Sequence, residues 1–386
     1  MRLLHTSDWH LGRSFHGVGL LEAQRRFIEA MVHTVRTEQV DVVLIAGDVY
    51  DRALPGVDVV NLLDEALVGI TAAGAQVVLT SGNHDSAVRL GFAGKLLARG
   101  GVHLRTRVAD LDLPVLLPVG DGQLAIYGLP YLEPRLVADE LGVETPGHSA
   151  VTEAALDRVR LDLEDRRRAG TVHAVVMAHT FASGGAGSDS ERDLSIGGLG
   201  AVPLSLFEDF DYTALGHLHG RQQLSGTVRY SGSPLPYSFS EARQHKGGWI
   251  LDFGPAGLVS VSAVDWPAER RLAVLRGRLA ELLEDPAHAW AEEAYCQVTL
   301  TDPQRPAQAM DKVRERFPDT VVLAFDPEGR SEEQRLSYSD RLAAAKNDLE
   351  VCCGFFDHVR GRAVDSEEKA ALTAALDAAR AAEVQR

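Results

Sequence analysis

Residues with metal-binding side chains follow five short apolar runs in the first part of the chain. The runs are residues 3–6, 41–46, 76–80, 173–178 and 212–215, and their composition predicts buried strands. The residues that follow or end them are Asp8, His10, Asp48, Asn83, His179, His217 and His219. Because functional groups in an open α/β sheet lie at the carboxyl ends of its strands, we expect these side chains to converge.

The mixture of carboxylate, amide and imidazole groups indicates which ions these residues would hold. Such a set suits a borderline ion such as Mn²⁺, Fe or Zn²⁺, whereas an all-carboxylate set would favour Mg²⁺ or Ca²⁺. Two ions about 3.5–4 Å apart that share a carboxylate can clamp a phosphate for in-line attack. Asp48 is the natural bridge, because it is the only central acid that directly follows a glycine, Gly47. The residues therefore predict a two-metal phosphoesterase.

Each of the five motifs has an ordinary structural explanation when it is taken alone. An Asp-x-His, Gly-Asp or Gly-Asn-His string is more often a turn or a loop cap, and a single histidine at a strand end is more often a half-buried polar residue. For the Gly216-His217-x-His219 string, metal binding and an ordinary structural role are about equally good explanations. All five in this order, each after an apolar run, favour the metal site.

The elements between and after these runs predict two sheets in one domain. Residues 20–38 and 57–73 have a helical pattern, which together with the runs indicates an α/β sheet. Residues 228–231, 248–253 and 258–264 form a β-rich stretch without long helices, and we expect it to supply a second sheet packed on the first. We place this domain at residues 1–267.

Two further parts complete the chain of 386 residues, which is too long for one typical core. Residues 268–328 predict a small α/β domain, with helices over 270–284 and 307–317 and strands over 295–300 and 320–325. Residues 329–386 predict a helical tail.

The tail pattern predicts two helices with apolar faces. Side chains at helical spacing make up the first face: Leu342, Ala345, Leu349, Cys352, Phe356 and Val359. Gly361 interrupts the pattern, and Asp365 with Glu368 resembles a capping box that opens a second helix, whose face is Leu372, Leu376 and Ala379. Such a short unit cannot bury its face alone, so we expect a partner helix to cover it; the alternative is packing onto its own body.

The net charge of −16 limits how the protein can bind nucleic acid. Proteins that bind DNA unaided usually present a basic face, so we expect phosphate contacts to be few and close to the metal ions. The candidates are arginines in or near the loops after the motif strands: Arg13, Arg89, Arg192 and Arg243. For each, a solvated surface charge is at least as good an explanation.

The remaining composition predicts a cytoplasmic protein. The three cysteines form no disulfide framework, which fits a reducing compartment. No apolar run approaches the length that spans a bilayer, and the N-terminal residues lack a signal-peptide pattern. We therefore expect no membrane partner.

The five motifs resemble those of the calcineurin-like metallophosphoesterases. Three longer strings, SDWHLGR (residues 7–13), GDVYD (47–51) and YSGSP (230–234), are similar to one branch of that superfamily, the SbcD nuclease subunits. The resemblance covers the whole chain. It implies an α/β fold in which two mixed sheets form a sandwich flanked by helices, followed by a small α/β capping domain and a C-terminal helical tail.

The resemblance also implies a role for each candidate site residue. One ion would be held by Asp8, His10, Asp48 and His219, and the second by Asp48, Asn83, His179 and His217. His84 would be the catalytic histidine that is not a ligand, and Asp51 is our candidate for the residue that orients it. Ala178 stands where many relatives have a glycine, which we expect only to tighten that turn.

The activity implied by the resemblance is that of a Mn²⁺-dependent nuclease. It would act as an exonuclease on double-stranded DNA ends and as an endonuclease on hairpins and single strands, in DNA repair, replication and recombination. Its partner would be an SbcC-like ATPase with long coiled coils, joined to a homodimer of this chain in a heterotetramer associated with the nucleoid.

Two other functions fit the same metal motifs. The first is a phosphatase or cyclic-nucleotide phosphodiesterase, since fold and metals do not fix the substrate. The YSGSP string, the cap and the tail argue against it, as does the absence of the Gly-Asp-x-Val-Asp-Arg-Gly string of protein phosphatases. The second is a scaffold that has lost its metals, which the presence of all seven ligand types makes the weaker alternative.

Overall fold

The computed structural model describes residues 1–191, 200–266, 270–328, 347–360 and 362–384. The chain divides into two compact units, Met1–Ala273 and Val274–Arg386, and each is described by itself. Among the described helices, none is both long enough and apolar enough to cross a membrane.

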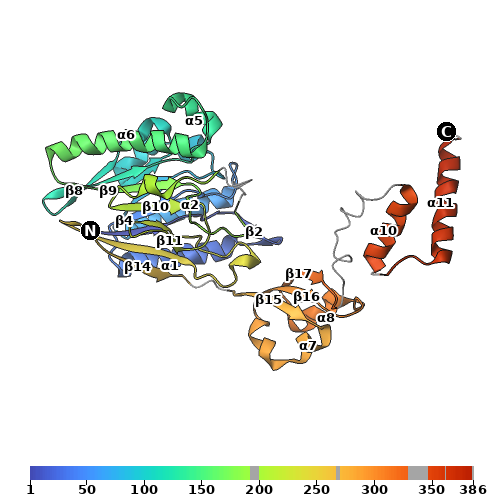
Figure 1. Cartoon of the computed structure of the whole chain (residues 1–386). Coiled ribbons are helices and arrows are strands. Elements are labelled where there is room, and N and C mark those ends of the chain that lie inside the picture. The colour runs from blue at the N-terminus through green and yellow to red at the C-terminus, as the bar shows by residue number, and fades with distance from the viewer. Residues whose placement is uncertain (192–199, 267–269, 329–346, 361, 385–386) are drawn as a thin grey trace. The chain divides into compact units, whose positions relative to one another are not determined.

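The first unit contains two six-stranded sheets (Figure 1). The first sheet has the order β14 (Gly257–Asp265), β13 (Gly247–Gly254), β1 (Arg2–Thr6), β4 (Val42–Ala46), β5 (Gln76–Thr80) and β6 (Val102–Arg105). β1, β4, β5 and β6 are parallel to one another, whereas β13 is antiparallel to both of its neighbours, β1 and β14. All five residues of β4 are buried, as expected for an apolar strand with both faces covered.

The second sheet supplies the other layer of the sandwich. Its order is β11 (Gln222–Gln223), β12 (Val228–Tyr230), β10 (Tyr212–Gly216), β9 (Val172–His179), β8 (Gly122–Gly128) and β7 (Val115–Val119). The four central strands are parallel and the two edge strands antiparallel. Side chains of both sheets share one apolar core, which includes Leu44 and Val78 from the first and Met177 from the second.

Helices cover the outer faces of the sandwich. On α1 (Leu21–Thr37), Phe27, Met31 and Val35 are buried at four-residue spacing, which gives the helix one apolar face. α2 (Val57–Ala72) contacts α1 and β5. α5 (Pro134–Leu141) and α6 (His148–Ala169) pack on the second sheet. In Figure 1, α6 and α1 therefore lie on opposite sides of the strands. Short elements lie in the loops: β2 (Ser14–Phe15), β3 (Val18–Gly19), α3 (Ala87–Leu90) and α4 (Gly94–Leu97).

The second sheet is not built as the sequence pattern suggested. We expected residues 248–253 and 258–264 to belong to it, but β13 and β14 extend the first sheet, where Leu251 pairs with Leu3. That prediction was wrong because an apolar pattern identifies a strand without identifying its neighbour. The second sheet instead recruits β7 and β8, which precede β9 in the chain.

The capping part contains a three-stranded sheet of β15 (Leu272–Gly277), β16 (Tyr295–Leu300) and β17 (Thr320–Phe325), with α7 (Leu279–Glu284) and α8 (Ala309–Arg316). The helix predicted over residues 270–284 is therefore wrong in its first half. Ala273 and Leu275 are buried and Val274 between them is 52% exposed, which is the alternation of a strand, and this strand lies next to β16.

The tail contains α10 (Asp348–Arg360) and α11 (Ser366–Val384), which contact each other. The predicted capping box is confirmed, because Glu368 N donates to Asp365 Oδ1 and Asp365 N donates to Glu368 Oε2, at 2.9 and 3.1 Å. Leu342, Ala345 and Gly361 lie outside the described residues, as do the side chains of Val359 and Ala379.

Candidate metal centre

The carboxyl ends of five parallel strands bring the predicted ligands to one edge of the sandwich. β1, β4 and β5 are neighbours in the first sheet, and β9 and β10 are neighbours in the second. The loops continue side by side beyond the strands: Asp8 N donates to Gly47 O at 3.1 Å, and His10 N donates to Asp48 O at 2.9 Å.

Two glycines allow the loops to approach this closely. A Cβ added to Gly82 would lie 2.2 Å from Asp48 Oδ1, and one added to Gly216 would lie 1.9 Å from Ala46 O. The motif glycines therefore make room for the Asp48 carboxylate and for contact between the two sheets.

Four of the predicted ligands have a positive φ angle, a backbone conformation that residues other than glycine rarely adopt. The φ angles are +53° at Asp8, +43° at His10, +46° at Asp48 and +111° at His217. Such strained residues persist where the surrounding structure holds them, and they gather at functional sites.

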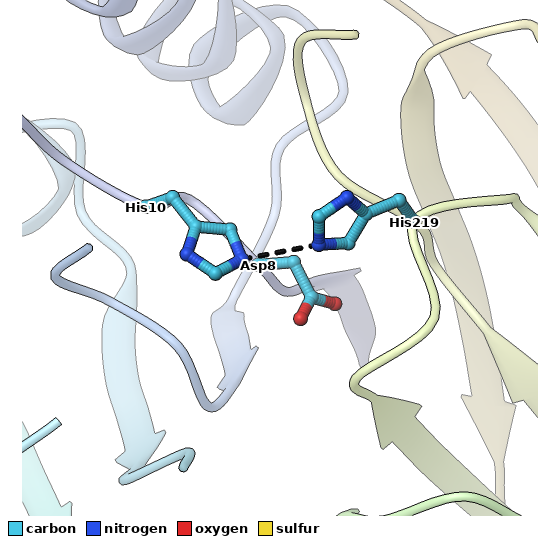
Figure 2. A group of neighbouring side chains, drawn as sticks. All are labelled: Asp8, His10 and His219. Atoms are coloured by element: carbon cyan, nitrogen blue, oxygen red, sulfur yellow. Dashed lines mark hydrogen bonds between the residues drawn. The ribbon is translucent and has the colours of Figure 1, made fainter. Parts of the chain in front are cut away.

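Figure 2 shows that Asp8, His10 and His219 lie together, from loops of both sheets. The Nε2 atoms of His10 and His219 are 3.1 Å apart. The carboxylate of Asp8 accepts from His217 N at 3.1 Å and from Ser7 Oγ at 2.5 Å. All three side chains shown in the figure are buried.

Asp48 lies at the centre of the remaining histidines. Its Oδ1 accepts from His84 N at 2.8 Å. Its Oδ2 is 3.3 Å from His179 Nε2, 3.7 Å from His10 Nε2 and 4.0 Å from His84 Nε2. Burial raises the pKa of this carboxyl, but the charge of His179 and its hydrogen bond outweigh burial and hold the pKa well below its ordinary value.

His179 is oriented so that one nitrogen faces the centre. Its Nδ1 donates to Ala46 O at 2.9 Å, and its Nε2 lies 2.9 Å from Asn83 Oδ1. Burial lowers the pKa of His179, but Asp48 outweighs burial and raises it to about 9 in the protein without bound metal. A metal ion that binds Nε2 would therefore have to displace a proton.

His217 lies beside His179 and is also buried. Its ring centre is 5.3 Å from that of His179, and burial lowers its pKa to about 3, so the imidazole is neutral. A neutral imidazole is the form that binds metal.

His84 lies beside the centre and is held through its other nitrogen. Its Nδ1 donates to the backbone oxygen of Asp51 at 2.8 Å. Asp51 is thus the orienting residue that we expected, but it acts through its main chain. Its carboxylate instead lies 3.6 Å from His10 Nδ1 and 3.7 Å from Arg13 Nη1.

The residues present fit divalent metal ions. Among the described residues, ligand atoms within 4.8 Å of one another form three groups: Asp8 with His10 and His219, His10 with Asp48 and His84, and Asp8 with Asp48 and His179. Two buried carboxylates this close repel each other, and burial raises the pKa of Asp8 to about 6. Cations between these groups would relieve the repulsion and satisfy the facing nitrogens of His10 and His219.

The candidate DNA-contacting arginines have different surroundings. The Arg13 guanidinium donates to Ser190 O at 2.8 Å and lies 5.0 Å from the centre of the Tyr237 ring, so it is largely engaged within the protein. Arg89 and Arg243 are exposed, and Arg192 lies outside the described residues.

Sequence reasoning missed several residues that support the centre. Asp85 accepts from the backbone nitrogens of Val49, Tyr50 and Gly82 at 2.9–3.0 Å, which joins the loops after β4 and β5. Its place next to His84 was the available signal. The other missed residues lie behind His219 and have no motif to mark them: Ser190, Glu191, Glu241 and Lys246.

Comparison with known proteins places the chain in a family. The model of the calcineurin-like phosphoesterase family matches residues 1–221, and that of the Type 5 capsule protein repressor C-terminal domain (SbcD_C) matches residues 269–359. A curated relative from Staphylococcus saprophyticus, named as the SbcD component of Nuclease SbcCD, is 30% identical over 328 residues, which are 84% of this chain and 84% of that protein. A second relative of the same name, from Staphylococcus epidermidis, is 29% identical over 84% of this chain and 85% of its own.

One of the solved structures that match the chain resembles it only distantly. GAP50, the anchor in the inner membrane complex of Plasmodium, aligns with 86% of this chain and 98% of its own at 10% identity, with a TM-score of 0.38. This likeness is too low to bear on function.

The sandwich and its cluster of aspartates and histidines define a metal-dependent phosphoesterase. The chain belongs to the calcineurin-like phosphoesterase family and, within it, to the family of the SbcD components of Nuclease SbcCD. The fold class and the resemblance predicted from the motif strings are confirmed, and the protein is a hydrolase of the nuclease class.

Proposed function

We propose that this chain hydrolyses phosphodiester bonds in DNA with two divalent metal ions. The observation that supports this most directly is the position of Asp48, whose carboxylate lies within 4.0 Å of the Nε2 atoms of three histidines. The names of the relatives supply the substrate class, since both are nucleases.

The proposed ligand sets are those that the family resemblance implies. Asp8, His10, Asp48 and His219 would hold one ion, and Asp48, Asn83, His179 and His217 the other. Mn²⁺ is the ion that we propose, because a mixed oxygen and nitrogen set suits a borderline cation. When bound, the ions would supply positive charge at the phosphate and a more acidic water.

His84 is the proposed catalytic residue. Its backbone nitrogen is fixed by Asp48 and its Nδ1 by Asp51, so the ring is held with Nε2 directed to the centre. At this position Nε2 of the doubly protonated ring, whose Nδ1–H stays on Asp51 O, can give its proton to the leaving 3′-oxygen or stabilise charge on the phosphate. General acid assistance of this kind contributes roughly 10²–10⁴ in rate.

We propose double-stranded DNA ends and hairpins as substrates and an SbcC-like coiled-coil ATPase as the partner. With a net charge of −16, phosphate contacts of the isolated chain should be few, and the exposed Arg89 and Arg243 are the remaining described candidates. The tail, residues 329–386, is the proposed ATPase-binding part, after a nuclease domain at 1–267 and a cap at 268–328. Action on DNA with this partner would place the protein in the cytoplasm at the nucleoid.

A homodimer within a heterotetramer is the proposed assembly. Exposed apolar side chains on the segment that follows His84 support a contact with another chain: Val88 is 87% exposed, Phe92 81% and Leu96 66%. Sedimentation of the isolated chain, with and without Phe92→Asp, tests this surface.

The function is tested by substrate choice. The purified chain with Mn²⁺ is given duplex DNA, a phosphoprotein and a cyclic nucleotide, with Asp48→Ala as the inactive control. We expect cleavage of DNA above all. Preference for the phosphoprotein or the cyclic nucleotide would move the protein to the phosphatase or phosphodiesterase class, and activity that survives in Asp48→Ala would point to a contaminant.

A further inference from the structure

The imidazole of His219 is held from behind by hydrogen bonds that lead to a buried ion pair. Its Nδ1 lies 2.6 Å from Ser190 Oγ, and this hydroxyl donates to Oε1 of Glu241. The other oxygen of Glu241 accepts from Lys246 Nζ. Glu241 is 1% exposed and Lys246 7%, so the ion pair is almost completely removed from water.

The direction of donation along this path is fixed at the carboxylate. An ionised carboxylate can only accept, so the single hydroxyl hydrogen of Ser190 points to Glu241. The Ser190 oxygen is then left to accept from Nδ1–H of His219. His219 is therefore the tautomer whose Nε2 carries the lone pair, and this nitrogen faces His10 (Figure 2).

The main chain of His219 is fixed by the same group of residues. Lys246 Nζ donates to the backbone oxygen of His219 at 2.8 Å, and the Glu191 carboxylate accepts from the backbone nitrogen of His219 at 2.7 Å. Lys246 Nζ also lies within 3.0 Å of Ser233 Oγ and 2.8 Å of Gln244 Oε1. Both the ring and the backbone of His219 are thus held before any ion binds.

Stability alone does not account for this arrangement. A buried ion pair contributes little net stability compared with apolar residues of the same size, because two charges lose their hydration. A pair placed behind a metal-binding histidine is explained better by what it positions.

We propose that Ser190, Glu241 and Lys246 are positioning residues for the metal ligand His219 and fix its tautomer and ring orientation for an ion shared with Asp8 and His10. This inference rests on the ligand set given under the proposed function. Partners that hold a metal-binding histidine in this way typically contribute about 10–100-fold to metal affinity.

Ser190→Ala is the cleanest test, because Ser190 lies partly exposed on a loop and its removal leaves the buried ion pair intact. Binding of Mn²⁺ is measured by calorimetry and by the electron paramagnetic resonance signal of the bound ion, and the Tm is measured without metal. We expect one of the two ions to bind about 10–100-fold more weakly, with an unchanged metal-free Tm. Ser190→Thr, which keeps the hydroxyl, should restore affinity. Ser183→Ala is the matched control, since this exposed hydroxyl accepts from Leu204 N.

Glu241→Gln provides a second measurement, because it keeps the size of the side chain and removes the charge that faces Lys246 and Ser190. Weaker binding of Mn²⁺ at the same site as in Ser190→Ala supports the proposal. Unchanged Mn²⁺ affinity and an unchanged resonance signal in Ser190→Ala overturn it, whatever Glu241→Gln does to folding. Failure of the unaltered chain to bind two ions would instead contradict the proposed function, so the two failures are distinguishable.

Discussion

The Nε2 atoms of His10 and His219 lie 3.1 Å apart, although the residues are 209 positions apart in the chain. Both rings are buried, and at most one of two facing neutral nitrogens can donate to the other. A cation bound by both lone pairs would satisfy the two nitrogens at once. This relationship therefore marks where an ion is expected.

Asp48→Ala should abolish binding of both ions, whereas His10→Ala should mainly weaken one. The reason is that the Asp48 carboxylate lies among histidines assigned to both ions, and without it two cations would face each other unshielded. Bound Mn²⁺ is counted by calorimetry and elemental analysis. One tightly bound ion that survives in Asp48→Ala would show that the bridge is assigned wrongly.

Gly82→Ala should displace the Asp48 carboxylate and impair metal binding without direct loss of a ligand. The new Cβ would lie 2.2 Å from Asp48 Oδ1 and 2.3 Å from Asp48 N, and overpacking of this kind costs about 1–3 kcal/mol of stability. Unfolding in urea and Mn²⁺ titration measure the two effects. Gly100→Ala is the control, because its Cβ would meet nothing within 4 Å. Equal behaviour of the two variants would contradict the close approach.

His84→Ala should keep both ions and lose most turnover, by roughly 10²–10⁴. Its Nδ1 donates to Asp51 O and its Nε2 is directed toward the centre, so the doubly protonated ring can give a proton from Nε2. Single-turnover cleavage of duplex DNA and a metal count are measured on the same preparation. His33→Ala on the exposed side of α1 is the matched control. Parallel loss of metal and activity would make His84 a ligand instead.

His5 should make the stability of the sandwich depend on pH. Its Nε2 donates to Leu215 O at 3.1 Å and its Nδ1 accepts from Tyr212 Oη at 3.0 Å, so the neutral ring joins β1 to β10. Burial lowers its pKa to about 3, below the ordinary value of 6.5. The unfolded chain therefore binds more protons between these values, and the stability contributed by neutral His5 is complete above about pH 6.5 and is lost as the pH falls toward 3.

The loss due to His5 should reach about 3 kcal/mol near pH 4.5. Urea unfolding at pH 7 and 4.5, without metal, compares the unaltered chain with His5→Gln, which retains one donor and one acceptor but does not titrate. The variant should lose less stability over this interval. Equal losses in both proteins would show that His5 is not responsible.

Leu349→Glu combined with Phe356→Glu should abolish co-purification with an SbcC-like ATPase and leave the Mn²⁺-dependent nuclease of the isolated chain intact. The two residues lie on α10 at helical spacing and are partly exposed in this chain alone. Ala371→Glu with Ala374→Glu, at exposed positions of α11, is the charge-matched control. Misfolding or a lower Tm of the first variant would show that the tail packs on its own body.

The sequence by itself determined the features that depend on local chemistry. Apolar runs such as Val42–Ala46 become buried strands because of their own side chains, and Gly47 permits the sharp turn after that strand because its φ of +82° suits glycine. The reciprocal bonds of Asp365 and Glu368 span three residues and could be predicted for the same reason.

Only the tertiary structure decided which distant segments meet. β13 pairs with β1 across most of the first unit, and no local pattern distinguishes that partner from another strand of equal apolarity. Glu241 reaches Ser190 across 51 positions, and neither residue belongs to a ligand motif. The free energy that selects such pairings comes from packing and burial over the whole domain, so it becomes visible only when the chain is folded.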